Sequence, residues 1–498
     1  MAPDVRFELL WPEFLVAGLA FVIFTLDFFL RPERKTILAW VSVFGLAGIL
    51  AFTIPYLSEE NDSLFNGLYR IDDYALFFKV LSMAIGGVVI LGSIHYVGRY
   101  LTHPGEYYAI LLLSVLAMMM MAASGELLTA YLSLELLSFC LYILSGFALH
   151  DKKSNEASVK YILLGAFSSG LLLYGIVMLY GAMGTTSFAE MAAFLNDIED
   201  VDGRLLIGLT LLVAGLGFKI AAVPFHMWAP DVYEGAPTPI TAHLAVGSKA
   251  AAFALIIRFF VSGLMPLMID LQIILVIMAA FTMTLGNLMA LVQSNIKRLL
   301  AYSSIGHAGY LILGLSALIS INQSGDFNLA FISKTNLVIN GIILHTIAYG
   351  ISNLTAFLCI SIIYKKVGQE NIKDLSGLSK RSPFLSMVFA SSLFSLAGLP
   401  IFAGFVSKFY LFTAASVQGL IWLVAIAIFT SLISLYYYLK VLKYMYIEKS
   451  ETNKQIHLSP LTISVLSVLF IAMIFIGVYP APLMDAIQHA TDALTMLN

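Results

Sequence analysis

The chain has 498 residues, of which 60% are hydrophobic and only 11% are charged. Because a soluble globular domain typically carries about 25% charged residues, this composition excludes a soluble protein and predicts an integral membrane protein. The formal net charge of −3 does not separate function classes, since the positions of charges in a membrane protein matter more than their sum. Cys140 and Cys359 lie in apolar segments without a CxxC motif, which argues against disulfides, iron–sulfur clusters and zinc sites.

Long apolar runs account for most of the chain. A helix needs about 20 apolar residues to cross a bilayer, and fourteen runs meet this requirement. The N-terminal stretch MAPDVRFELLWPEFLVAG lacks the basic region and cleavage site of a signal peptide, so we expect a retained first helix. The predicted fold class is an all-α polytopic membrane protein with 14 transmembrane helices. These helices are predicted at residues 11–30, 36–57, 74–97, 107–123, 125–149, 158–182, 204–229, 238–261, 268–292, 299–320, 336–364, 384–414, 417–445 and 461–480.

The lysines and arginines are distributed unevenly between the two sides that this helix count predicts. Five of the 27 lie inside predicted helices, and most of the others follow odd-numbered helices. Basic residues near helix ends favour the cytoplasm, so we expect both termini on the non-cytoplasmic side. No Pro/Ser-rich linker or charge block divides the chain, so 1–498 is predicted to form a single membrane domain. The polar stretch 183–203 includes SFAEMAAFLNDIED, where a short surface helix is expected.

Two segments have similar sequences. AGLGFKIAAVPFH (214–226) and AGLPIFAGFVSKFYLF (397–412) each combine Ala-Gly-Leu, a proline and one lysine. Pro224 and Pro400 each remove one backbone donor and clash with the preceding turn, which breaks a helix. Prolines also kink membrane helices without any functional role. Their coincidence with a lysine in both segments favours helix breaks at a functional site.

Three lysines lie in runs that would span the membrane without them. Lys219 lies in the seventh predicted helix, Lys249 in the eighth and Lys408 in the twelfth. A lysine near the centre of a spanning helix costs about 2.5–3.5 kcal/mol on insertion scales. Burial weakens the hold of an ammonium group on its proton, and a nearby carboxylate strengthens it. These lysines therefore predict proton-transfer sites, with structural salt bridges as the alternative.

The fifth predicted helix carries a polar stripe that includes a carboxylate. Tyr131, Glu135, Ser138 and Tyr142 follow one another at spacings of four, three and four residues, which place them on one helical face. Glu126 lies on the opposite side at the helix start, where a cap or an interfacial position is expected. We therefore expect Glu135 to pair with the lysine of the seventh helix.

Histidines lie on similar polar stripes further along the chain. His307 and His345 each share a helix face with a serine and a tyrosine. A lone buried histidine is usually structural, but helices that also carry lysines make a hydrated proton relay an equally good interpretation. His226 and His243 lie near helix ends and are interpreted as structural. Arg258 lies toward one helix end and is expected to extend to the membrane interface.

Motifs of soluble enzymes are missing from the sequence. It contains no HExxH, no GxSxG, no Walker motif and no dinucleotide-binding fingerprint. The sequence therefore predicts no metal site, no cofactor in this chain and no nucleic-acid partner. Haem ligation by membrane histidines is an alternative that no specific motif supports. The run MMMM (118–121) is interpreted as apolar packing.

Three longer segments resemble signatures of a known family. KIAAVPFHMWAPDVYEGAPTPITAHLAVGSKAA (219–251), SNIKRLLAYSSIGHAGY (294–310) and SLAGLPIFAGFVSKFYLF (395–412) are similar to antiporter-like membrane subunits of respiratory complex I and of multi-subunit cation/proton antiporters. Together with the predicted helices, the resemblance extends over almost the whole chain. Within complex I, Lys408 argues against a paralogue with glutamate on helix twelve. The chain end at Asn498 argues against one with a long lateral helix.

The resemblance implies an architecture of two inverted five-helix repeats in which helices seven and twelve are broken. Helices one to three would then occupy residues 1–106 and the first repeat, with helices four to eight, residues 107–261. The second repeat, with helices nine to thirteen, would occupy residues 268–445, and helix fourteen residues 461–480.

The resemblance also implies a function and a set of site residues. The family has a buried axis of a glutamate on helix five, lysines on helices seven and eight, and a lysine or glutamate on helix twelve. The matching residues here are Glu135, Lys219, Lys249 and Lys408.

The implied activity is proton translocation by a membrane-arm subunit of a NADH-quinone oxidoreductase of the complex I type. The implied location is a bacterial inner membrane, where the chain contacts the lipid bilayer. NADH, FMN, iron–sulfur clusters and quinone are expected in partner subunits of the membrane and peripheral arms. The main alternative is a subunit of a multi-subunit cation/proton antiporter. A structural scaffold without pumping activity and a solute carrier are weaker alternatives.

Overall fold

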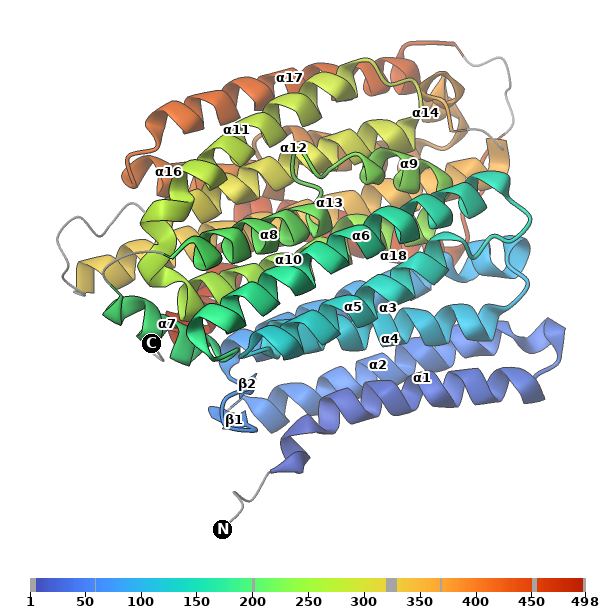
Figure 1. The fold of residues 1–498 in the computed structure, drawn as a ribbon. Helices are drawn as coiled ribbons and strands as arrows, with labels where there is room; N and C mark the ends of the chain where they lie inside the picture. Colours follow the sequence, from blue (N-terminus) through green and yellow to red (C-terminus); the bar gives the residue numbers. More distant parts are fainter. Residues whose placement is uncertain are drawn as a thin grey trace. The chain divides into compact units, whose positions relative to one another are not determined.

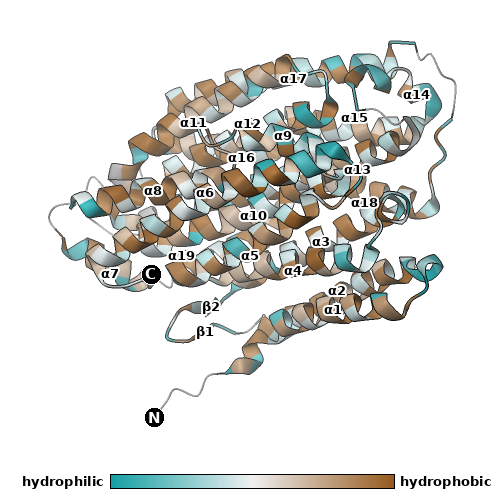
Figure 2. Ribbon diagram, turned by 45° about the vertical axis from the view of Figure 1, so that its right-hand side comes forward, coloured by the Kyte–Doolittle hydropathy of each residue, from teal (hydrophilic) through white to brown (hydrophobic). Residues whose placement is uncertain are grey.

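Most of the described chain is helical (Figure 1). The computed structural model describes residues 6–58, 60–198, 202–318, 329–367, 370–449 and 455–495. Within these residues, twelve helices are long and apolar enough to cross a membrane. In Figure 2, apolar residues dominate helices such as α1 and α2 over most of their length. The long helices are α1 (Trp11–Phe29), α2 (Thr36–Leu57), α3 (Asp73–Tyr100), α4 (Pro104–Ala123), α5 (Leu127–Ser145), α6 (Lys152–Met183), α10 (Thr238–Gly263), α11 (Met268–Leu291), α12 (Ile296–Ala317), α13 (Leu329–Val367), α17 (Ile421–Tyr446) and α18 (Pro460–Val478).

Two further apolar segments each consist of two shorter helices. In the first, α8 (Gly203–Lys219) ends well before α9 (Trp228–Gly235) begins. In the second, α15 (Pro383–Ala397) and α16 (Ala403–Val417) are separated by five residues that include Pro400. The first interruption follows Lys219 and contains Pro224, and the second contains Pro400 and precedes Lys408 by a few residues, as the sequences of these segments indicate.

The backbone at both interruptions adopts conformations that most residues avoid. Ala221 has a φ of 57° and Ile401 a φ of 80°, in the left-handed region where a Cβ atom is disfavoured. The Val223–Pro224 peptide bond is cis. Side chains satisfy some of the backbone donors that the interruptions free. The N–H of Val223 donates to Thr282 Oγ1 at 3.0 Å, and the N–H of Gly404 donates to Ser395 Oγ at 3.1 Å.

The chain forms two compact units. The first comprises Met1–Ile220, Gly247–Leu271 and Ala486–Asn498, and the second comprises Ala221–Val246 and Gln272–Asp485. In the first unit, α4 packs against α1, α3 and α5, and α6 packs against α8. In the second unit, α13 is central and packs against α12, α15, α16 and α18. Each unit thus buries one or two helices inside a bundle, where polar side chains can be kept away from lipid.

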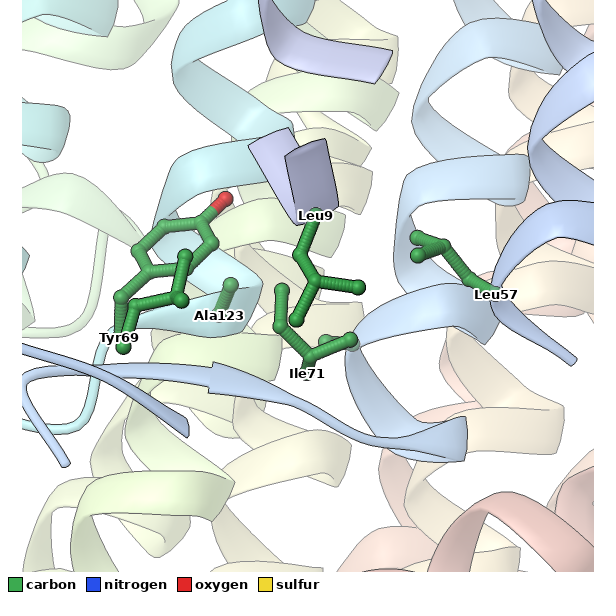
Figure 3. Packing of buried hydrophobic residues seen from close by; sticks show 7 residues of the cluster. Leu9, Leu57, Tyr69, Ile71 and Ala123 are labelled. Atoms are coloured by element: carbon green, nitrogen blue, oxygen red, sulfur yellow. The ribbon is translucent and has the colours of Figure 1, made fainter. Parts of the chain in front are cut away.

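A two-stranded hairpin precedes α3, and the sequence did not predict it. Strands β1 (Asp62–Leu64) and β2 (Tyr69–Ile71) pair antiparallel through a turn in which Gly67 has a φ of 90°. Close packing at this turn requires glycine at position 125, where a Cβ atom would collide with the carbonyl oxygen of Gly67. Figure 3 shows the apolar cluster in which side chains of the hairpin pack. Its buried members are Leu9, Leu57, Leu64, Tyr69, Ile71, Ala75 and Ala123.

Among the described residues, three more α-helices remain, of which the sequence predicted one. The expected short surface helix in the stretch after residue 183 is α7 (Phe188–Asp197). The helix α19 (Ala481–Thr495) was not predicted, because its fifteen residues are fewer than a span requires. The last two residues of the predicted span 299–320 lie outside the described residues. A four-residue helix, α14 (Leu378–Arg381), was not predicted either.

Candidate functional site

Glu135 and Lys219 lie close together inside the first unit, as expected from the sequence. Glu135 is on α5, and Lys219 is the last residue of α8, immediately before the helix interruption. The Lys219 Nζ atom lies 3.8 Å from Glu135 Oε1, and the two side chains are 9% and 14% exposed. The two groups are therefore buried and oppositely charged, but too far apart for a direct hydrogen bond.

Two serines provide the hydrogen bonds that the loose ion pair lacks. Lys219 Nζ donates to Ser138 Oγ at 2.5 Å, and Ser169 Oγ on α6 donates to Glu135 Oε1 at 2.6 Å. The ammonium also lies 5.9 Å from the centroid of the Tyr142 ring. Since neutral groups stabilise both charges separately, the pair can open and close without leaving either side chain bare.

The position of Lys219 at a helix end adds a further electrostatic effect. The last carbonyl groups of a helix have no partner within the helix and form the negative end of its dipole. An ammonium in the last turn of α8 is stabilised by this partial charge. Only an interruption after residue 219 places a helix end at this lysine.

Glu126 is separate from this pair, as its position on the helix predicts. It lies at the start of α5, and its carboxylate accepts hydrogen bonds from Thr129 at 2.8 Å and from Thr186 at 2.7 Å. An apolar pocket lies one helical turn from the pair. It is lined by residues of five helices that include Tyr131, Leu134 and Leu216.

Lys249 and Lys408 are also buried. Lys249 lies in the first unit on α10 and is 2% exposed. Lys408 lies in the second unit on α16, and its Nζ donates to the carbonyl oxygens of Leu396 at 2.9 Å and Ala397 at 3.1 Å. A third hydrogen bond goes to Ser431 Oγ at 2.8 Å. The two carbonyl groups belong to the end of α15, so the second interruption also presents the negative end of a helix to a lysine.

His307 and His345 contact each other in the second unit. His307 Nδ1 lies 3.2 Å from His345 Nε2, and His345 Nδ1 lies 3.1 Å from Ser407 Oγ. All three side chains are less than 5% exposed. The string therefore joins α12, α13 and α16, and it ends one residue before Lys408. Sequence reasoning selected both histidines but missed Ser407, because a serine in a membrane helix carries no signal of its partner on another helix.

Two buried ion pairs in the first unit were not assigned a role from the sequence. Lys79 Nζ lies 2.8 Å from Glu13 Oε1, which also accepts a hydrogen bond from the Tyr69 hydroxyl at 2.7 Å. Arg258 makes two hydrogen bonds to Asp72, at 2.6 and 2.7 Å. The expectation that Arg258 extends to the membrane interface is wrong. Its guanidinium is buried and donates hydrogen bonds to this carboxylate and to the carbonyl oxygen of Ala122.

The Asp72 carboxyl group precedes α3 and is almost completely buried. Burial alone disfavours its ionised form, but the charge and the hydrogen bonds of Arg258 outweigh burial and hold the pKa of Asp72 below its ordinary value. Asp72 therefore remains ionised, and the pair is a permanent link between α3 and α10.

Comparison with known proteins identifies relatives over the whole length of the chain. The family described as NADH:quinone oxidoreductase/Mrp antiporter, TM matches residues 124–319 and 315–434. A protein named NADH-quinone oxidoreductase subunit N from Desulforamulus reducens is 38% identical over 493 residues, which are 99% of this chain and 100% of the relative. A protein of the same name from Moorella thermoacetica is 40% identical over 490 residues, with 98% and 99% covered.

Solved structures share the fold. A chain of respiratory complex I from Thermus thermophilus with bound aureothin superimposes with a TM-score of 0.78 at 27% identity, covering 96% of this chain and 99% of that chain. A chain of the Mrp complex from Dietzia superimposes with a TM-score of 0.80 at 20% identity, covering 97% of both chains. At this low identity, the second similarity shows the fold alone.

Proposed function

Because the chain belongs to the NADH:quinone oxidoreductase/Mrp antiporter membrane family, we propose that it acts as a proton-translocating subunit of subunit N type. It would belong to the membrane arm of a NADH-quinone oxidoreductase, the enzyme of respiratory complex I. The overall reaction is inferred from the name of the relatives, NADH-quinone oxidoreductase subunit N. The observation that carries the mechanism is the loose, serine-supported pair of Glu135 and Lys219.

The mechanism is an electrostatic switch at this pair. When the pair is closed, the carboxylate stabilises the ammonium form of Lys219. When Glu135 moves away, the buried ammonium loses its counter-charge and holds its proton less tightly. Each tenfold change in proton affinity corresponds to about 1.4 kcal/mol, so opening the pair by conformational change in the enzyme can drive a proton uphill. Ser138 and Ser169 give the two charged side chains polar partners other than each other, which lowers the cost of opening the pair.

Lys249, His307, His345 and Lys408 are the further proton sites in this proposal. Each of these side chains is buried, and each belongs to a helix of one of the two bundles. Amines and imidazoles exchange protons near neutral pH when their surroundings are tuned, and water between them can carry the proton. A structural role for the two histidines is the competing interpretation.

The proposed architecture has fourteen membrane helices in a single membrane domain over 1–498. In this architecture, α8 with α9 forms helix seven, and α15 with α16 forms helix twelve. Helices one to three (1–106) precede two inverted repeats, 107–261 and 268–445, and helix fourteen (461–480) follows them. Support comes from the two interruptions, each with a lysine, a proline and a non-glycine residue of positive φ.

The cofactors and the location follow from the same proposal. This chain would hold no redox centre, and NADH, FMN, iron–sulfur clusters and quinone would bind to partner subunits of the two arms. The chain would lie in a bacterial inner membrane with both termini on the non-cytoplasmic side. The distribution of lysine and arginine supports this orientation.

A cation/proton antiporter subunit is the second candidate function. It is supported by the shared family description and by the fold of the Mrp complex chain. The relatives of 38–40% identity over nearly the full length carry the name subunit N, which favours the redox-coupled enzyme.

The proposed function is tested with Lys219→Ala in the assembled complex. We expect fewer protons translocated per electron, because the switchable proton site is lost, while electron transfer from NADH to quinone is retained in part. Proton uptake and NADH oxidation are measured together in proteoliposomes.

The matched control is Lys160→Ala, which removes a lysine of α6 that is 42% exposed and paired with Glu156 on the surface. It should leave the stoichiometry unchanged. An unaltered number of protons per electron in Lys219→Ala would contradict the proposed mechanism.

A further inference from the structure

The string of His307, His345 and Ser407 can be hydrogen-bonded in two ways. Imidazole in its neutral form has one N–H donor and one acceptor nitrogen, so each ring must choose one of two tautomers. Because His345 uses both of its nitrogens, to His307 and to Ser407, its tautomer also determines that of His307. The direction of the whole string is therefore a single choice.

Ser407 makes one of the two directions more favourable. Its hydroxyl lies 3.1 Å from the carbonyl oxygen of Gly404, which can only accept a hydrogen bond. When the hydroxyl donates to this carbonyl, it must accept from His345 Nδ1–H, and His345 Nε2 must then accept from His307 Nδ1–H. This arrangement contains three hydrogen bonds. In the reverse arrangement the hydroxyl donates to His345 Nδ1, and its hydrogen bond to the Gly404 carbonyl is lost.

We propose that Ser407 is a positioning residue that fixes both histidines as Nδ1–H tautomers and so directs the string from α12 toward α16. The string is completely buried, so no bulk water replaces a missing hydrogen bond. Ser407 acts on His307 without contacting it, because His345 transmits the choice. This inference rests on the proposed function only in assigning the string to proton transfer.

The direction has a consequence for proton transfer. A proton that arrives at His307 Nε2 releases the Nδ1 proton of His307 to His345 Nε2. His345 then releases its own Nδ1 proton to Ser407 Oγ as the serine hydroxyl turns away from the Gly404 carbonyl and gives its original proton to a water or amine base. One proton enters, one leaves, and both rings end as Nε2–H tautomers. The resting arrangement set by Ser407 is therefore ready for transfer toward α16 and must be restored before the next proton.

The test is the tautomeric state of the two rings in the assembled complex labelled with ¹³C,¹⁵N-histidine. Solid-state NMR distinguishes the tautomers, and spectra of His307→Gln and His345→Gln complexes assign the signals by difference. In the wild-type complex both rings should be Nδ1–H. In Ser407→Ala, both rings should shift toward Nε2–H by about two- to tenfold, the size expected for one neutral hydrogen bond. Ser407→Thr retains the hydroxyl and should preserve the wild-type state.

The matched control is Ser316→Ala, which removes another buried hydroxyl, one that donates to the backbone carbonyl of Leu313 within α12. It should leave both tautomers unchanged. Nε2–H rings in the wild-type complex would overturn the proposal, even if Ser407→Ala does not assemble. Nδ1–H rings that persist in Ser407→Ala would also overturn it. Failure of the proposed function is a separate result, in which Lys219→Ala leaves the number of protons per electron unchanged.

Discussion

The buried basic side chains of this protein have different kinds of partners. Arg258 is held by two short hydrogen bonds to one carboxylate, and Lys79 lies 2.8 Å from another. Lys219, by contrast, is 3.8 Å from its carboxylate, and Lys408 is held by carbonyl oxygens and a serine. A short ion pair is costly to open in a low-dielectric interior, whereas neutral partners can be exchanged for water. The geometry thus separates closed ion pairs from lysines whose partners are neutral groups or a more distant carboxylate.

Asp72→Asn tests the structural pairs. It leaves the Arg258 charge buried without a counter-charge, so we expect a loss of about 3–5 kcal/mol of stability. The loss should appear as a lower thermal unfolding midpoint and as poor assembly of the subunit. Because the folded-state pKa of Asp72 is lowered, the stabilisation is present above the ordinary carboxyl pKa of 3.8 and is lost as the pH falls through the folded-state pKa.

The control for this prediction is Asp202→Asn. Asp202 is an exposed residue before α8 that accepts a hydrogen bond from the backbone N–H of Arg204. Asparagine is as good a helix cap as aspartate, so little change in stability is expected. Equal effects of the two substitutions would argue against a structural role for the buried charge pair.

The sequence identified those site residues whose charge is energetically costly inside an apolar helix. A lysine or glutamate inside an apolar run requires an explanation, and helical spacing then placed Glu135 on the face that contacts Lys219. Ser407 costs little in a membrane helix and therefore gave no signal. Its importance comes from His345, 62 positions earlier in the chain, and such contacts between helices are not visible in a single sequence.

At the scale of helices, the length of an apolar run determines whether an element can be predicted from the sequence. Runs of about 20 apolar residues predict long helices well, because no other structure satisfies its backbone inside a bilayer. The hairpin of β1 and β2 has strands of only three residues, too short for a recognisable alternation. In α19 the apolar residues are spaced for one buried face, so the helix is amphipathic and does not resemble a span.

The backbone of the second interruption is strained at Ile401, whose φ is 80°. A left-handed conformation costs a residue with a Cβ atom roughly 1–2 kcal/mol, and the Ile401 side chain is 62% exposed, so it contributes little packing. Ile401→Gly should therefore stabilise the protein by up to about 1 kcal/mol, after the greater freedom of glycine in the unfolded chain is subtracted. The unfolding midpoint of the complex should rise.

Ile428→Gly is the control for this prediction. Ile428 is 51% exposed and lies within the regular helix α17, where glycine lowers stability. The two identical substitutions should thus have opposite signs. If Ile401→Gly lowered the midpoint as Ile428→Gly does, the backbone at residue 401 would not be strained.

At the scale of the whole molecule, each compact unit contains its own buried sites. The first unit contains Glu135, Lys219 and Lys249, and the second contains the histidine string and Lys408. Apart from Glu135 and the Ser407 hydroxyl, these groups are amines or imidazoles, which carry positive charge when protonated. In their protonated forms these groups would repel other cations, which gives a test between the two candidate functions.

Proton translocation should not depend on sodium. A sodium ion near Lys219 or Lys408 would be repelled by about 4 kcal/mol at a distance of 4 Å and an effective dielectric constant of 20. We therefore expect NADH-driven proton uptake to remain the same when sodium is replaced by potassium at constant ionic strength, which keeps electrostatic screening unchanged. The measurement uses the complete complex in proteoliposomes with a sodium-sensitive dye as a second readout. Sodium movement opposite to protons, or a loss of uptake without sodium, would favour the antiporter function, because an exchanged sodium ion would then have to approach these lysines while they are unprotonated.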